Sequence, residues 1–140
     1  MRPELSTCLI ILLLCMAASL GSPLAQASPA DGTWLLRDKL AIQISDCEGG
    51  LCGRIVWLRN PALRTPAMCG RTIVWGLVPN GPSQWGNGRI FDPEDGNTYH
   101  LSATLQPDDT ISARIYEGIA LFGETKILTR VKVGDLPGRC

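Results

Sequence analysis

The stretch Leu40-Ala41-Ile42-Gln43-Ile44-Ser45 decides the fold class, because branched apolar residues alternate along it with small or polar ones. A period of two is typical of a β-strand that buries one face and exposes the other. The same period appears just before this stretch, at residues 32–37, and just after it, at residues 51–58. Helical periodicity is not sustained anywhere after residue 27. The sequence therefore predicts an all-β protein.

Strand-like segments recur to the end of the chain, at residues 72–77, 88–91, 99–105, 110–116 and 124–131. Turn sequences rich in Pro, Gly, Asn and Asp separate several of them, at residues 79–82, 92–97 and 106–109. Residues 59–70, which contain Pro61 and Pro66, break the pattern and predict an excursion with a short helical turn. About eight short strands joined by tight turns favour a small antiparallel barrel or sandwich.

The N-terminal residues have the layout of a secretory signal peptide. Arg2 precedes an apolar run at residues 9–14, and Ala25-Gln26-Ala27 supplies small residues at the −3 and −1 positions of a cleavage site. We therefore expect residues 1–27 to be a signal peptide and residues 28–140 to form one exported, periplasmic domain.

The charges of the chain balance, with 13 Lys and Arg against 13 Asp and Glu. This balance argues against a nucleic-acid partner and against a general anionic-membrane surface, both of which need an excess of cations. No apolar run after residue 27 approaches the roughly 20 residues that span a bilayer. We expect a soluble domain that does not span the membrane.

Removal of the leader leaves four cysteines, Cys47, Cys52, Cys69 and Cys140. An even number in an exported small domain favours disulfides. Residues 47–52 form a short segment with two central glycines, so a bridge across a hairpin is geometrically reasonable. Three pairings are open; we favour Cys47 with Cys52 and Cys69 with Cys140. A zinc site is disfavoured because His100 is the only histidine, so we expect no metal and no cofactor.

The two ends of the strand-rich region suggest a closed sheet. Gly32-Thr33-Trp34 begins the first strand and Thr129-Arg130-Val131 ends the last. Together they resemble the G-x-W and late-arginine pair of lipocalin-like barrels, in which the arginine stacks over the tryptophan and seals one end. Such a contact is worth about 0.5–2 kcal/mol. The resemblance implies that Trp34 and Arg130 close the barrel; the alternative is that Trp34 is an ordinary core residue.

Most of the chain after residue 31 resembles one family of small exported bacterial proteins, domain of unknown function 2147. The resemblance rests on Gly32-Thr33-Trp34, on residues 52–58, on residues 88–99 and on Leu121-Phe122-Gly123 ahead of Arg130. Its most specific part is Gly88-Arg89-Ile90-Phe91-Asp92-Pro93-Glu94-Asp95-Gly96-Asn97-Thr98-Tyr99. The resemblance implies a fold and a compartment but no activity. Cysteine at position 69 departs from the family's pattern, which leaves its partner open.

Candidate catalytic groups do not combine into a mechanism. Asp92, Glu94 and Asp95 suit a turn better than a calcium loop, which needs ligands at alternate positions and a distant carboxylate. His100 has no nucleophile motif beside it. We therefore expect a protein that is not an enzyme.

Aromatic residues spread over several strands line either a packed core or an apolar pocket. For a pocket, the candidate ligand-binding residues are Trp57, Trp75 and Tyr99, with Arg54 and Arg71 receiving an anionic head group. The leading hypothesis is a periplasmic barrel that binds a small apolar or amphipathic ligand. The alternative is an envelope protein-interaction or stress-related module with a filled barrel and no small ligand. A cavity of several hundred Å³ would favour the first.

Overall fold

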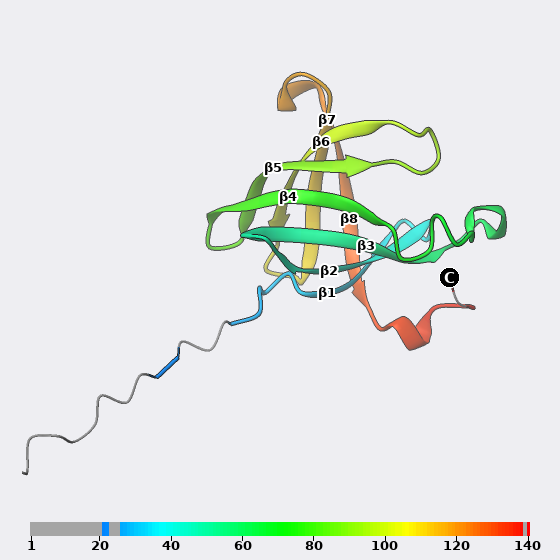
Figure 1. The fold of residues 1–140 in the computed structure, drawn as a ribbon. Helices are drawn as coiled ribbons and strands as arrows, with labels where there is room; N and C mark the ends of the chain where they lie inside the picture. The colour runs from blue at the N-terminus through cyan, green and yellow to red at the C-terminus, as the bar shows by residue number, and fades with distance from the viewer. Residues whose placement is uncertain (1–20, 23–25, 139) are drawn as a thin grey trace, which may run out of the picture.

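Strands that are neighbours in the sequence are neighbours in the structure, and they close into a barrel (Figure 1). The computed structural model describes residues 21–22, 26–138 and 140. Within these residues there are eight antiparallel strands: β1 Gly32–Leu36, β2 Leu40–Cys47, β3 Gly50–Leu58, β4 Thr72–Gly81, β5 Gln84–Phe91, β6 Thr98–Leu105, β7 Thr110–Tyr116 and β8 Glu124–Val131. The same residues contain no α-helix, only short 3-10 turns, η2 Pro61–Leu63, η3 Ala120–Phe122 and η4 Val133–Asp135. The predicted antiparallel β-barrel is confirmed.

The barrel is closed by pairing of the first strand with the last. β1 pairs with β2 on one side and with β8 on the other, with Trp34 opposite Arg130. Because consecutive strands are antiparallel, all odd-numbered strands run the same way. The β2–β3, β4–β5 and β6–β7 turns therefore share one end with the start of β1, which we call the closed end. The other four connections share the opposite end, which we call the mouth.

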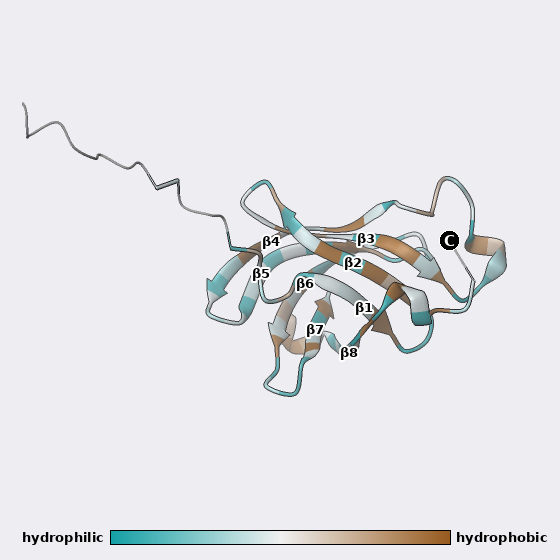
Figure 2. Cartoon of the chain, turned by 90° about the horizontal axis from the view of Figure 1, so that it is seen from below, coloured by the Kyte–Doolittle hydropathy of each residue, from teal (hydrophilic) through white to brown (hydrophobic). Residues whose placement is uncertain are grey.

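Alternation of side chains places the apolar residues of each strand inside the barrel. On β2, Ile42 and Ile44 belong to the buried core, whereas the intervening Gln43 accepts a 2.7 Å hydrogen bond from the Thr33 hydroxyl of β1. In Figure 2, hydrophobic segments lie along β2 and β3, while many of the connecting turns are hydrophilic. The buried faces of the strands together form the hydrophobic core of the barrel.

The alternation is interrupted on β3. Ala41 pairs with Trp57 and Ile42 pairs with Ile55, which leaves Val56 as the extra residue of a β-bulge. A bulge shifts the phase of the side chains by one residue. Ile55 faces the core, and Trp57, two residues later, does not join it.

The predicted loop at residues 79–82 is shorter than expected. β4 continues through Gly81 and β5 begins at Gln84, so only two residues connect them. Pro79 pairs with Trp85 beside a register shift. Proline has no N–H for the ladder and is tolerated next to such an irregularity.

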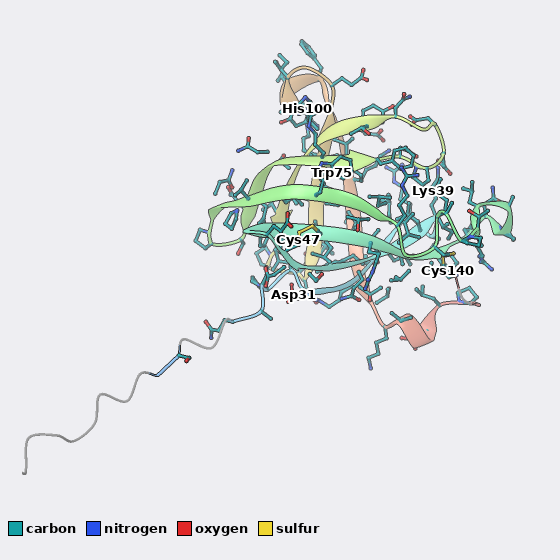
Figure 3. The ribbon with its side chains drawn as sticks, viewed as in Figure 1. Asp31, Lys39, Cys47, Trp75, His100 and Cys140 are labelled. Carbon is teal, nitrogen blue, oxygen red and sulfur yellow. A yellow bond between two sulfur atoms is a disulfide. The ribbon has the colours of Figure 1, made fainter. Side chains whose placement is uncertain are left out.

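Two disulfides are present, and they join the pairs favoured from the sequence. Cys47–Cys52 crosses the β2–β3 hairpin at the closed end. Cys69–Cys140 ties the segment after β8 to the β3–β4 connection (Figure 3). The predicted signal peptide, residues 1–27, falls mostly outside the described residues and stays a prediction.

Candidate functional site

A cavity of about 760 Å³ occupies the barrel interior and opens at the mouth. Its wall is made of apolar side chains from all eight strands and two of the connections: Leu36, Leu40, Ile42, Ile44, Leu58, Leu63, Ile73, Val74, Leu77, Ile90, Phe91, Leu101, Ala103, Ile111, Ala113, Ile115, Phe122 and Leu128. The charged residues that border it belong to the mouth: Arg37, Lys39, Arg59, Asp92, Glu94, Asp95, Glu117, Glu124 and Lys126. The space is therefore apolar inside and polar at its entrance.

Small residues leave room in the middle of this wall. Ala103 of β6 and Ala113 of β7 are directly paired across the two strands, and both line the cavity. Larger residues at this pair would project into the space that a guest would occupy. The cavity therefore depends on small side chains at this pair as well as on an apolar wall.

Two tryptophans lie between the cavity and the closed end. Trp34 and Trp85 are buried in the core cluster, but neither lines the cavity. The Trp34 side chain is completely buried, and its indole N–H donates a 2.8 Å hydrogen bond to the Ala30 carbonyl. A buried indole needs such a partner. The chain entering β1 and the Trp34 ring together form a floor.

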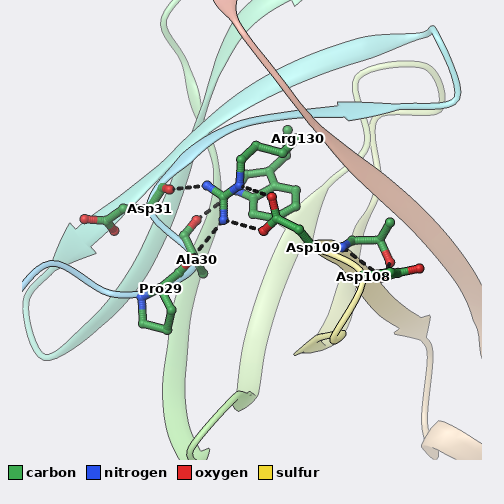
Figure 4. A network of polar contacts seen from close by, with 8 residues as sticks. Pro29, Ala30, Asp31, Asp108, Asp109 and Arg130 are labelled. Atoms are coloured by element: carbon green, nitrogen blue, oxygen red, sulfur yellow. Dashed lines mark hydrogen bonds and ion pairs between the residues drawn. The ribbon is translucent and has the colours of Figure 1, made fainter.

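Arg130 covers this floor from outside (Figure 4). Its guanidinium carbon lies 4.2 Å from the centre of the Trp34 ring. The same group donates to both carboxylate oxygens of Asp109, at 2.8 and 3.0 Å, and to the carbonyls of Asp31 and Pro29, at 2.6 and 3.0 Å. The arginine therefore ties β8, the β6–β7 turn and the chain before β1 together.

Arg130 affects the pKa of Asp109 and limits the residue that fits at position 32. Its hydrogen bonds to Asp109 hold the pKa of that carboxyl below its usual value. Gly32 has φ +138°, and a Cβ there would stand 2.5 Å from an Arg130 nitrogen. The glycine of the G-x-W motif is therefore required by both its backbone conformation and the close approach of the arginine.

An ion pair joins opposite sides of the mouth. Lys39 Nζ of the β1–β2 turn lies 2.9 Å from Glu94 Oε2 of the β5–β6 connection, and these two connections sit on opposite sides of the barrel. Figure 3 labels Lys39 at this end of the molecule. Both side chains are 55% exposed, so the pair is solvated and weak. It bridges the entrance without filling it.

The carboxylates of residues 92–97 mainly hold their own turn. Asp92 Oδ1 accepts the Glu94 N–H at 2.8 Å, and Asp95 Oδ1 accepts the Asn97 N–H at 2.8 Å. The Tyr99 hydroxyl donates to Asp95 Oδ2 at 2.5 Å, which lowers the pKa of Asp95 and raises the pKa of Tyr99. Only Glu94 of these three carboxylates reaches across the mouth.

The five residues predicted to bind a ligand are not brought together. Tyr99 lines the cavity near the mouth. Arg71 does not, although its guanidinium stacks 4.0 Å over Phe91, which does. Arg54, Trp57 and Trp75 do not line the barrel cavity. Trp57 instead lines a second pocket, of about 590 Å³, between β3 and the segment after β8.

Strand geometry explains why these three side chains lie outside the barrel cavity. Arg54 is exposed, since its neighbours Gly53 and Ile55 are the buried residues of that segment. The β3 bulge turns Trp57 out of the barrel interior, where it is buried against the segment after β8 and its indole N–H donates to the Pro137 carbonyl at 2.8 Å. Trp75 follows the cavity-lining Val74 and is 39% exposed.

The aliphatic wall and the Lys39–Glu94 pair were not identified from the sequence. The alternation in the sequence showed which side chains of a strand share a face, as for Leu40, Ile42 and Ile44 of β2, but not that the space beside them is open. The sequence pattern of inward-facing Ile, Leu and Val is the same whether the barrel interior is filled or hollow. The contact between residues 39 and 94 depends on closure, which places distant turns at one rim.

Among the described residues, no three His, Cys, Asp or Glu side chains gather closely enough to hold a metal ion. His100 does not line the cavity; it stacks on Tyr116 with ring centres 5.2 Å apart and lies 3.4 Å from an Arg89 nitrogen. In the same residues no helix is long and apolar enough to cross a membrane.

A family model described as "Uncharacterized protein conserved in bacteria (DUF2147)" matches residues 32–130. The chain belongs to this family. The matched region of the DUF2147 protein runs from the glycine of the G-x-W motif to Arg130, so it covers the barrel except for the last residue of β8 and includes both halves of the closing contact. No curated protein matches the chain.

A solved structure resembles the fold of this DUF2147 protein. It is described as "Protein HP1028 from the human pathogen Helicobacter pylori belongs to the lipocalin family". The two chains superpose with a TM-score of 0.58 and 15% sequence identity, over 73% of this chain and 82% of that one. At this identity the comparison shows a lipocalin-like fold and nothing about a ligand.

Proposed function

We propose that this protein is a non-enzymatic, exported barrel that binds one small apolar or amphipathic molecule. The observation that carries the proposal is the cavity of about 760 Å³, apolar in its wall and open at one end. This volume lies within the range of roughly 300–1,000 Å³ found for small-molecule sites. The filled barrel of the alternative hypothesis does not agree with it.

The distribution of polarity supports an amphipathic guest. An apolar tail buried against the aliphatic wall would leave water, and this transfer drives binding. A polar head would stay at the mouth, beside Lys39, Arg59, Tyr99 and the carboxylates of residues 92–97. No charged group would have to be desolvated inside the barrel.

Export is part of the same proposal. Both disulfides connect cysteines that lie after the predicted cleavage site, as expected for a protein that folds in an oxidising compartment. The arrangement of residues 1–27 agrees with this route.

Binding is best tested with an extrinsic probe. All four tryptophans lie in the described residues, and none of them lines the cavity, so their fluorescence is a weak reporter. We would titrate the protein with 1-anilinonaphthalene-8-sulfonate and displace the probe with single-chain fatty acids and lysophosphatidylcholine, each below its micelle-forming concentration.

The matched variants are A113F and S112F. Ala113 lines the cavity, whereas Ser112, its neighbour on β7, does not. We expect A113F to weaken probe and fatty-acid binding at least tenfold and S112F to leave it unchanged. A103F, at the paired position, provides a second block if A113F fails to fold. Absence of binding to the wild-type protein, or equal loss in A113F and S112F, would contradict the proposal.

A further inference from the structure

An apolar tip projects from the barrel beside its mouth. Ile119, Leu121 and Phe122 of the β7–β8 connection are 57%, 75% and 81% exposed. Figures 1 and 3 show this connection as the projection beyond β6 and β7, with its side chains extending outward. Phe122 and Gly123 also line the cavity, so the tip borders the entrance. We call residues 119–122 the apolar tip.

The apolar tip is held in shape by Arg114 of β7. The guanidinium donates to the Ala120 carbonyl at 2.8 Å, to the Leu121 carbonyl at 2.9 Å and to the Thr125 hydroxyl at 3.0 Å. The exposed apolar side chains are therefore presented by a fixed backbone.

The carbonyl groups of the tip have hydrogen-bond partners inside the protein. The Ile119 carbonyl accepts the Phe122 N–H at 3.3 Å, and the Ala120 carbonyl also accepts the Gly123 N–H at 3.1 Å. With Arg114, the three carbonyls at residues 119–121 all have partners inside the protein. Carbonyls that already have partners cost less to move away from water, which favours entry of the tip into an apolar environment.

The size and charge of the tip favour a lipid surface over a protein partner. Three side chains of this size expose on the order of 400 Å², about half of the roughly 800 Å² that each partner buries in a stable protein interface. Residues 118–123 carry no charge, and Glu117 and Glu124 flank them. Attraction to anionic head groups is therefore not expected, and insertion would rest on apolar contact alone.

We propose that the apolar tip inserts into the surface of a phospholipid bilayer and thereby turns the mouth of the cavity toward the lipid. The inference rests on the proposed function, since the guest would be taken from, or delivered to, that surface. The chemical class it assigns to the guest is a membrane lipid or a single-chain lipid product.

The test is flotation of the exported protein with vesicles of pure phosphatidylcholine. We expect the wild-type protein to float with the vesicles equally well at low and at about 0.5 M salt, where surface charges are screened. L121E should lower the bound fraction about tenfold, as expected for losing the burial of one leucine side chain. V78E is the matched control, because Val78 is an exposed apolar residue on the β4 segment near the closed end.

Several outcomes would overturn the inference. They are a wild-type protein that ignores these vesicles, equal binding by L121E and V78E, or binding that needs an anionic lipid. Docking of the tip on an envelope protein, with protein-free vesicles ignored, would overturn it too.

Probe binding separates this failure from failure of the proposed function. Leu121 does not line the cavity, so L121E should bind the naphthalene sulfonate probe as the wild-type protein does. If the wild-type protein binds probe but no vesicles, only the docking fails. If it binds vesicles but no probe, the proposed function fails, and the transfer of a guest fails with it.

Discussion

The two ends of the barrel are built from different interactions. At the closed end, a completely buried tryptophan lies under an arginine that contacts four separate residues. At the mouth, the Lys39–Glu94 pair joins opposite sides of the opening, and its side chains are each 55% exposed. The difference indicates that the contacts at the closed end contribute more to the stability of the fold than the solvated pair at the mouth.

The largest expected effect is at Trp34. W34A should lower the free energy of unfolding by about 3–5 kcal/mol, because it leaves a large void in the floor. W75A, at a tryptophan that is 39% exposed on the outer wall, should cost less than about 1 kcal/mol. Chemical denaturation measures both values. Similar losses of unfolding free energy in W34A and W75A would contradict the larger contribution assigned to the closed end.

The next comparison sets two arginine–aromatic contacts against each other. R130M should lower the free energy of unfolding by about 1–2 kcal/mol, through loss of the contact with Trp34 and of its hydrogen bonds. Arg71 stacks on Phe91 at the mouth at a similar distance, 4.0 Å, and no ion pair joins it to another of the described residues. R71M should therefore cost clearly less. An equal or larger loss in R71M would show that the mouth is as important for stability.

A smaller effect concerns pH. The pKa of Asp109 is held below its usual value by Arg130, so its ionised form stabilises the folded state at pH values above the ordinary aspartate pKa. This contribution is lost as the pH falls through the lowered pKa. The wild-type protein should thus be more stable than D109N at neutral pH, and the difference should shrink below about pH 4. Urea unfolding of both proteins across this range tests it; a difference independent of pH would contradict it.

The smallest effect on stability is expected at the mouth. K39Q should change the free energy of unfolding by less than about 1 kcal/mol, as for other exposed ion pairs. It should nevertheless speed probe release severalfold in stopped-flow fluorescence, because the bridge across the opening is lost.

K126Q is its control. It breaks the Lys126–Glu124 pair, whose two residues belong to the same strand and do not span the mouth. Equal release rates for K39Q, K126Q and the wild-type protein would exclude a gating role for the bridge.

Much of the fold could be predicted because a half-buried strand has a recognisable local pattern of alternating apolar and polar residues. The alternation at residues 40–45, the turn residues and the Trp34–Arg130 pair predicted the strands and their closure. The cavity could not be predicted, since an inward isoleucine has the same local sequence whether the space beside it is filled or empty. Trp57 was expected to line the barrel cavity and does not, because the β3 bulge turns it out of the interior. This bulge depends on pairing with β2 and has no clear local sequence pattern.

The most direct test is native mass spectrometry of the protein purified from the compartment to which it is exported. We expect the wild-type protein and S112F to retain the same small apolar molecule, and A113F to lose it. Unliganded masses for the wild-type protein, with no adduct after incubation with fatty acids or lysophosphatidylcholine, would contradict a ligand-binding barrel.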